Sequence, residues 1–159
     1  MPIRITKSDF TPHLCFTLVF GVVVFCLLFA IVARAEGAEI DMSIIAQIES
    51  SNNPLAYNRH SGARGKYQLT EIAWQDVQNN FPSLRRYPFI YAYKPKVALL
   101  FAKAYFVLID RYIAHFGLKN DLSVKLACYN QGISPTRKGK YSKETVNYIA
   151  KYHKLAKAR

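Results

Sequence analysis

The segment PKVALLFAKAYFVLIDRYIAHF, residues 95–116, has the clearest helical period in the chain. Its apolar residues recur at intervals of three and four, which places them on one face of an α-helix. These residues are Leu99, Ala102, Phe106, Ile109, Ile113 and Phe116. Gly117 follows directly, and glycine is a common residue at the end of a helix. The segment therefore predicts the longest helix of a mainly helical domain.

Two shorter helical segments come before this one. Residues 41–51 predict a helix capped by Asp41, and residues 70–81 predict a helix capped by Thr70. The apolar contacts expected from the second helix are Ile72, Trp74 and Val77. Residues 57–69 have no helical period, and they predict either a short β-hairpin or an irregular loop.

Two further helical segments come after it. Asp121 opens a short helix that extends through residues 126 and 127, and Ser142 opens the last helix. The apolar residues expected on one side of the last helix are Val146, Ile149, Tyr152 and Leu155. No segment shows a convincing strand alternation. The sequence therefore predicts a mainly α single domain.

The amino-terminal part of the chain has a different character. Residues 14–32, LCFTLVFGVVVFCLLFAIV, contain no charged residue, and they lie between basic residues and the small residues Ala33 and Ala35. This pattern is typical of an export signal, and the apolar run is also long enough to span a bilayer. We expect either a signal peptide cleaved after Ala35 or a retained inner-membrane anchor. Both place residues 36–159 outside the cytoplasm, in the periplasm or cell envelope.

The composition excludes several classes of protein. The 159 residues are 51% hydrophobic and carry a formal net charge of +12, which excludes a disordered tail, a collagen-like repeat and a low-complexity linker. Two of the three cysteines lie in residues 14–32, so Cys128 has no partner for a disulfide in the exported domain. The histidines are scattered, and we expect neither a metal site nor a cofactor.

Glu49 is the most informative residue of the predicted helix over residues 41–51. On a helical wheel it falls within the apolar stripe of that helix. The stripe consists of Met42, Ile45 and Ala46 and is widened by Ile44 and Ile48. A carboxyl that is shielded from water keeps its proton to a higher pH and can serve as a general acid. The alternative is a carboxylate paired with one of the many Lys or Arg side chains.

Short polar motifs follow Glu49 along the chain. Ser50 is adjacent to it, and Asn53-Pro54 comes next. Gly62 and Gly65 precede Gln68, whose amide suits sugar hydroxyl and acetamido groups. We expect the two glycines to let the backbone approach a bulky ligand, although an ordinary turn would require them as well.

Two more motifs lie in the carboxy-terminal third. Tyr129 and Asn130 again pair a flat ring with an amide, within the segment ACYNQG over residues 127–132. Glu144 and Tyr148 are one helical turn apart on the last predicted helix, so they share a face. Glu144 can support a site there, or it can simply be a favourable charge in the first turn of that helix.

The order of these motifs resembles the lytic transglycosylase domain of the soluble-transglycosylase type, in the lysozyme-like superfamily. The resemblance extends over residues 44–152 and includes Glu49-Ser50, Asn53-Pro54, the glycine pair with Gln68, residues 127–132, and Tyr148. Two departures are Lys66-Tyr67, where the family usually has an aliphatic pair, and Cys128, where alanine is common. We interpret Cys128 as a small buried side chain.

The resemblance implies a lysozyme-like fold and an enzyme that acts on the glycan strands of peptidoglycan. Cleavage between N-acetylmuramic acid and N-acetylglucosamine would leave a 1,6-anhydro product, with Glu49 as the single acid and base. The residues implied to bind or position the substrate are Ser50, Gln68, Tyr129, Asn130, Glu144 and Tyr148.

Other functions remain open at this point. One is a muramidase that uses water, as in goose-type lysozymes, and another is a weakly active wall-binding accessory module. The small size also resembles transglycosylases that open the wall for a secretion, pilus or conjugation apparatus. The basic surface fits anionic partners outside the cytoplasm or simply keeps the domain soluble. Nucleic acid is not expected as a partner, because the export segment removes the chain from it.

Overall fold

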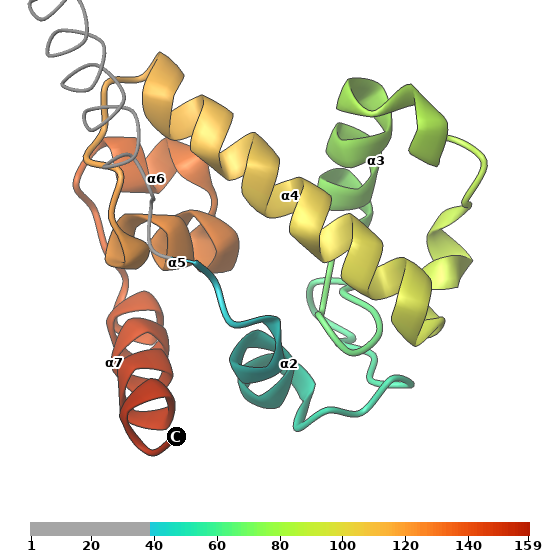
Figure 1. Ribbon diagram of the computed structural model, residues 1–159, viewed down its shortest axis with the longest axis horizontal. Helices are drawn as coiled ribbons and strands as arrows, with labels where there is room; N and C mark the ends of the chain where they lie inside the picture. Colours follow the sequence, from blue (N-terminus) through green and yellow to red (C-terminus); the bar gives the residue numbers. More distant parts are fainter. Residues whose placement is uncertain (1–38) are drawn as a thin grey trace, which may run out of the picture. The chain divides into compact units, whose positions relative to one another are not determined.

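The computed structural model describes residues 39–159, drawn in colour in Figure 1. The predicted export segment over residues 14–32 and the boundary at Ala35 lie outside these residues. Within residues 39–159 no helix is long and apolar enough to cross a membrane. This part of the chain contains six α-helices, two 3-10 helices and no strand, which confirms the mainly α prediction.

The five predicted helices begin close to the predicted positions, whereas two 3-10 helices and the short helix over residues 133–137 were not predicted. The elements are α2 (Met42–Ser50), α3 (Glu71–Asn80), η1 (Pro82–Leu84), η2 (Phe89–Tyr93), α4 (Pro95–His115), α5 (Leu122–Gln131), α6 (Ile133–Arg137) and α7 (Lys143–Lys157). The predicted capping residues are confirmed, because each accepts a hydrogen bond from a backbone N–H of the first turn. These residues are Asp41, Thr70, Asp121 and Ser142.

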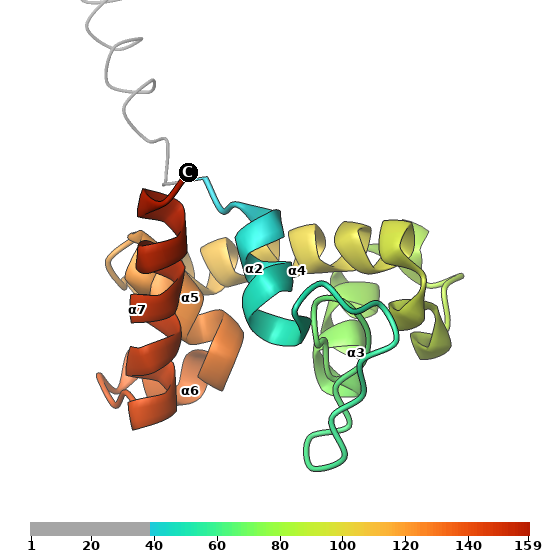
Figure 2. The same ribbon diagram turned by 90° about the horizontal axis from the view of Figure 1, so that it is seen from below.

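Helix α4 runs through the middle of the domain. In Figure 1 it crosses between α3 on one side and α5 with α6 on the other, and it packs against both α3 and α5. Figure 2 shows α2 lying between α7 and the loop that leads to α3. The buried residues of α4 include Phe101, Ala102, Phe106, Ile109 and Ile113. The apolar face predicted for residues 95–116 is therefore the centre of the core.

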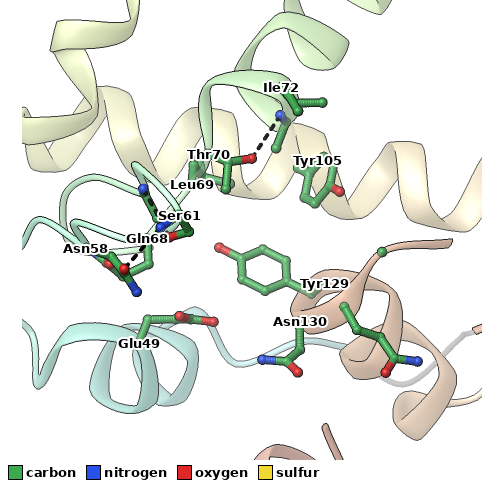
Figure 3. A pocket seen from close by; sticks show the side chains of 14 residues that line it. Glu49, Asn58, Ser61, Gln68, Leu69, Thr70, Ile72, Tyr105, Tyr129 and Asn130 are labelled. Atoms are coloured by element: carbon green, nitrogen blue, oxygen red, sulfur yellow. Dashed lines mark hydrogen bonds between the residues drawn. The ribbon is translucent and has the colours of Figure 1, made fainter. Parts of the chain in front are cut away.

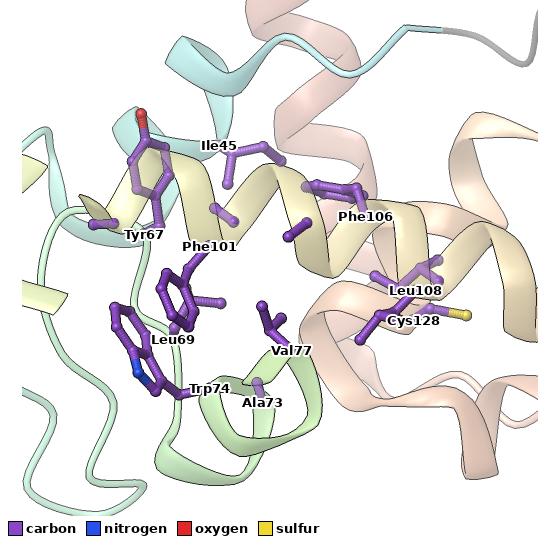
Figure 4. Packing of buried hydrophobic residues seen from close by; sticks show 14 of the residues in the cluster. Ile45, Tyr67, Leu69, Ala73, Trp74, Val77, Phe101, Phe106, Leu108 and Cys128 are labelled. Carbon is purple, nitrogen blue, oxygen red and sulfur yellow. The ribbon is translucent and has the colours of Figure 1, made fainter. Parts of the chain in front are cut away.

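Trp74 joins α3 to α4. Its indole ring lies against the ring of Phe101 (Figure 4). The two rings are stacked, with their centroids 3.5 Å apart. The indole Nε1 donates a hydrogen bond of 2.9 Å to the backbone oxygen of Tyr87, so the one polar atom of this buried ring has a partner. Cys128 of α5 is also buried, as predicted.

The carboxy-terminal end of the chain is tied to the start of α2. The Tyr152 hydroxyl of α7 accepts a hydrogen bond of 2.8 Å from the backbone N–H of Asp41. Arg159 pairs with the Asp41 carboxylate at 2.6 Å. Helices α2 and α7 therefore pack side by side, although they lie at opposite ends of the described part of the sequence.

Three apolar residues lie elsewhere than the sequence predicts. Phe116, predicted on the apolar face of α4, is 38% exposed at the end of that helix. Val146 is 53% exposed, because α7 buries Thr145, Tyr148 and Tyr152 instead. Thr145 tolerates burial because its hydroxyl has hydrogen-bond partners, described below. Ile72 is 74% exposed, while its helix α3 buries Trp74 and Val77 as predicted. In α3 and α7 an apolar stripe is present as predicted, but not every residue assigned to it is buried.

The connection from α2 to α3 is an irregular loop rather than a hairpin. It contains only single antiparallel bridges, between Tyr57 and Arg64 and between Arg64 and Leu69. Gly65 in this loop has a φ of +76°, and a Cβ added there would lie 1.8 Å from the backbone oxygen of Ala92. The space that Gly65 leaves is therefore filled by η2, not by a ligand as the sequence suggested.

We expect the Gly65→Ala substitution to destabilise the domain by about 2–4 kcal/mol, through the clash with Ala92 and the positive φ. Gly62→Ala is the matched control, since Gly62 also has a positive φ of +70° but no atom within 4 Å of an added Cβ. We expect the control to cost about 1 kcal/mol. Urea denaturation of both variants measures the difference, and equal stabilities would contradict this packing.

Candidate functional site

A pocket of about 510 Å³ opens between α2, the loop before α3, and the end of α5. Helix α2 contributes Glu49, the loop contributes Asn58 and Gln68, and α5 contributes Tyr129 and Asn130. Figure 3 shows these side chains around a common space. The structure therefore brings together four of the residues selected from the sequence, from segments up to 81 positions apart, Glu49 to Asn130.

The Glu49 carboxyl is the acidic group of this pocket. The apolar stripe of α2 is confirmed, with Ile44, Ile45 and Ala46 buried, and Glu49 is itself partly buried. Burial raises the pKa of Glu49 to about 7, although the Tyr148 hydroxyl and the positive charge of Lys151 both act to lower it. Desolvation therefore outweighs the two favourable partners, and the carboxyl holds its proton up to about neutral pH.

Tyr148 projects from α7 toward this carboxyl. Its hydroxyl is buried and forms no hydrogen bond within residues 39–159. It nevertheless lies close enough to Glu49 to lower the pKa of that carboxyl. Burial and the negative charge of Glu49 raise the pKa of Tyr148, so its hydroxyl stays protonated. Tyr148 is therefore a neutral donor that can stabilise Glu49 when the carboxylate forms.

Gln68 is held by its own loop. Its Nε2 donates hydrogen bonds to the backbone oxygens of Ala56 and Gly65, at 3.2 and 2.9 Å. Its φ of +46° is uncommon for a residue with a side chain, and such strain is frequently found at functional sites. Within residues 39–159 nothing donates to its Oε1, so this oxygen is free to accept a hydrogen bond.

Tyr129 lines the pocket, and Figure 3 shows its side chain between Glu49 and Tyr105. The hydroxyl donates to the backbone oxygen of Tyr67 at 2.7 Å. The ring stacks on Phe106 of α4, with the centroids 4.8 Å apart and the planes nearly parallel. These contacts hold the Tyr129 side chain in one position at the pocket.

Asn130 is oriented from behind by Thr145. The Thr145 hydroxyl, which is fully buried, lies 2.8 Å from Asn130 Oδ1 and 2.8 Å from Gln131 Oε1. Gln131 in turn donates through Nε2 to the backbone oxygen of Lys140 at 2.7 Å. This network fixes the end of α5 to the start of α7 and holds the Asn130 amide at the pocket.

Three residues selected from the sequence, Tyr148, Ser50 and Glu144, are not among those that line the pocket. Ser50 donates through its Oγ to the backbone oxygen of Lys66 at 2.8 Å, which fastens the end of α2 to the loop. Glu144 is exposed in the first turn of α7, and hydrogen bonds to its own backbone and to Ser142 lower its pKa. These contacts place Glu144 at the helix terminus rather than in the pocket.

The structure also adds residues that the sequence analysis missed. Asn58, Ser61, Ile72 and Tyr105 line the pocket. Asn58 and Ser61 lie in an irregular loop, and Tyr105 lies on the long helix, where no local pattern marks a pocket. One sequence pattern could have indicated Thr145: its helical spacing from Tyr148 and Tyr152 places a polar residue on the same face of α7. Within residues 39–159 no group of three His, Cys, Asp or Glu side chains is placed to hold a metal ion.

The pocket combines one carboxyl group, whose pKa is raised to about 7, with amide groups and a flat ring. No second carboxylate occurs among its lining residues in the described part of the chain. Such a site can donate and accept a proton near neutral pH and can bind a polar, uncharged ligand. Comparison of the chain with protein families, curated proteins and solved structures finds no match.

We expect a carbon-detected NMR titration to give Glu49 a midpoint near pH 7. Between the ordinary pKa of about 4.5 and the raised value, the folded state holds more protons than the unfolded state. The contribution of Glu49 to stability therefore decreases as pH rises through this range. Glu49→Gln should gain stability relative to the wild type from about pH 4 to about pH 8, by at most roughly 3 kcal/mol. A Glu49 midpoint at the ordinary glutamate value would contradict its burial.

We expect Thr145→Val to destabilise the domain by about 1–3 kcal/mol, because the buried Thr145 hydroxyl no longer shares its proton between the side-chain oxygens of Asn130 and Gln131. Gln131 keeps a second donor, the backbone N–H of Ser142, whereas Asn130 Oδ1 loses the hydrogen bond. The side-chain amide NMR signal of Asn130 should shift as well. Thr145→Ser keeps the hydroxyl and should retain most of the stability and the signal position. An unchanged Asn130 signal in Thr145→Val would show that the hydrogen bond does not hold this amide.

Proposed function

We propose that the protein is a peptidoglycan lytic transglycosylase with a lysozyme-like fold. The observation that carries this proposal is the single pocket carboxyl, Glu49, whose pKa burial raises to about 7. A general acid works best when its pKa lies near the working pH. The motif order described above supplies the substrate class, and the amide-rich pocket lining supports a polar sugar as ligand.

The absence of a second carboxylate among the described lining residues supports the non-hydrolytic reaction. Most glycosidases use two carboxylates, one as acid and one as base or nucleophile. An enzyme with one carboxyl must take the other reacting group from its substrate. The acetamido group and the 6-hydroxyl of an N-acetylmuramic acid residue can provide such groups.

The proposed reaction begins with protonated Glu49. Its proton goes to the glycosidic oxygen as the bond between that oxygen and the anomeric carbon breaks, and the acetamido oxygen stabilises the positive charge at that carbon. The Glu49 carboxylate then removes the proton of the 6-hydroxyl. The 6-oxygen bonds to the anomeric carbon, which gives the 1,6-anhydro sugar. No water is consumed, and Glu49 ends in its starting protonation state.

The neighbours of Glu49 have distinct roles in this scheme. The Tyr148 hydroxyl stabilises the carboxylate between the two proton transfers, since it stays protonated and lies close to Glu49. Gln68 accepts a hydrogen bond from a sugar N–H or hydroxyl through its free oxygen. Asn130 binds sugar polar groups with an amide held in place by Thr145. Ser50 acts indirectly, through the position of α2.

We also propose where the protein acts. The export segment would deliver the domain to the periplasm or cell envelope, with or without a membrane anchor at residues 14–32. An enzyme of this size would open the wall locally, for example for a secretion, pilus or conjugation apparatus.

We expect purified residues 36–159 to release anhydro-muropeptides from peptidoglycan and Glu49→Gln to lose at least about a thousandfold in rate, since the acid and base are one group. Glu144→Gln is the matched control, because Glu144 is exposed and lies outside the pocket, and it should remain active. Mass spectrometry of the products measures both.

Reducing ends instead of anhydro ends, heavier by one water, would identify a hydrolytic muramidase. Binding to the wall without any cleavage would identify an accessory module. Full activity of Glu49→Gln would refute the assignment of Glu49.

A further inference from the structure

The pocket has two unlike walls. One wall is largely apolar: it includes Ile72 and Leu69 next to the ring of Tyr105, with Thr70 as its polar member (Figure 3). In Figure 3 these residues lie on the side opposite Glu49 and Asn130, with the Tyr129 ring between the two sides. A ligand that fills this space must therefore present a polar edge to one wall and an apolar face to the other.

Ile72 is the most exposed member of the apolar wall. It is 74% exposed, whereas Ala63, Leu69 and Ala73 of the same wall are buried. An exposed apolar side chain by itself is common on protein surfaces. Ile72 differs because it borders a pocket that contains the raised-pKa carboxyl, and because it contributes little to the core beside its buried helix neighbours Trp74 and Val77.

The exposure of Ile72 leaves apolar surface in water until a ligand covers it. Covering apolar surface is favourable in proportion to the area removed from water. Sugar rings fit such a site, because their carbon–hydrogen faces and N-acyl methyl groups are apolar while their hydroxyl and amide edges are polar. An amino sugar without its acyl group lacks this methyl group and therefore covers less of the apolar wall.

We infer that Ile72 is a specificity-determining contact, which packs against the apolar face of an N-acylated sugar whose polar edge lies toward Glu49. This inference rests on the proposed function. Ile72 takes no part in proton transfer, and its effect is on substrate binding. The pocket accordingly favours N-acetylated glycan strands over de-N-acetylated ones.

The test compares Ile72→Ser with Leu55→Ser. Leu55 is a matched control, because it is 73% exposed and is not among the residues that line the pocket. Both variants should melt at the wild-type temperature, since neither side chain is buried. Ile72→Ser should raise KM for peptidoglycan about tenfold with little change in kcat, which is the usual scale for a lost apolar contact. Leu55→Ser should leave both constants unchanged, and Ile72→Val should restore most of the binding.

Binding of tri-N-acetylchitotriose, followed by NMR, separates this inference from the proposed function. If the wild type binds the trisaccharide but does not cleave peptidoglycan, the proposed function fails, and weaker binding by Ile72→Ser still supports the contact. If Ile72→Ser binds as tightly as Leu55→Ser, the inference is overturned. It is overturned also if the wild type does not bind the trisaccharide, or binds the de-N-acetylated trisaccharide equally well.

Discussion

The burial of α4 between α3 and α5 is the constraint on which the pocket depends. Each of these neighbours contributes a wall of the pocket. Ile72 lies in the first turn of α3, and Tyr129 and Asn130 lie in the last turn of α5. The stacking of Trp74 on Phe101 fixes the first neighbour, and the stacking of Tyr129 on Phe106 fixes the second. The apolar face of one helix therefore sets the width of the space opposite Glu49.

The second determinant of the site is the set of opposing effects on the pKa of Glu49. Burial favours its neutral form, whereas the Tyr148 hydroxyl and the Lys151 charge favour the carboxylate, and burial has the larger effect. A stronger cationic partner would return the pKa to the ordinary glutamate range and remove the proton at neutral pH. The site therefore combines enough shielding to keep the proton with a donor close enough to stabilise the charge when the proton leaves.

Local signals allowed much of the fold to be predicted, and tertiary contacts explain what was missed. Asp121 and Ser142 were predictable as caps, because capping depends on the residue and its next three neighbours. Ile72 was misplaced because only the packing of α3 on α4 decides which apolar residue of the first turn is buried. Tyr105 was missed because it lines the pocket only as a result of the packing of α5 on α4, which no local sequence pattern reveals. The place of Glu49 in an apolar stripe was evident from helical spacing alone.

Helix α7 reaches the site from the far end of the chain. It supplies Tyr148 to Glu49, Thr145 to Asn130, and Tyr152 to the start of α2. A growing chain in which α7 has not yet been synthesised would thus have neither the donor beside the Glu49 carboxyl nor the hydrogen bond that holds the Asn130 amide. The complete pocket therefore assembles only after α7 has joined the rest of the domain.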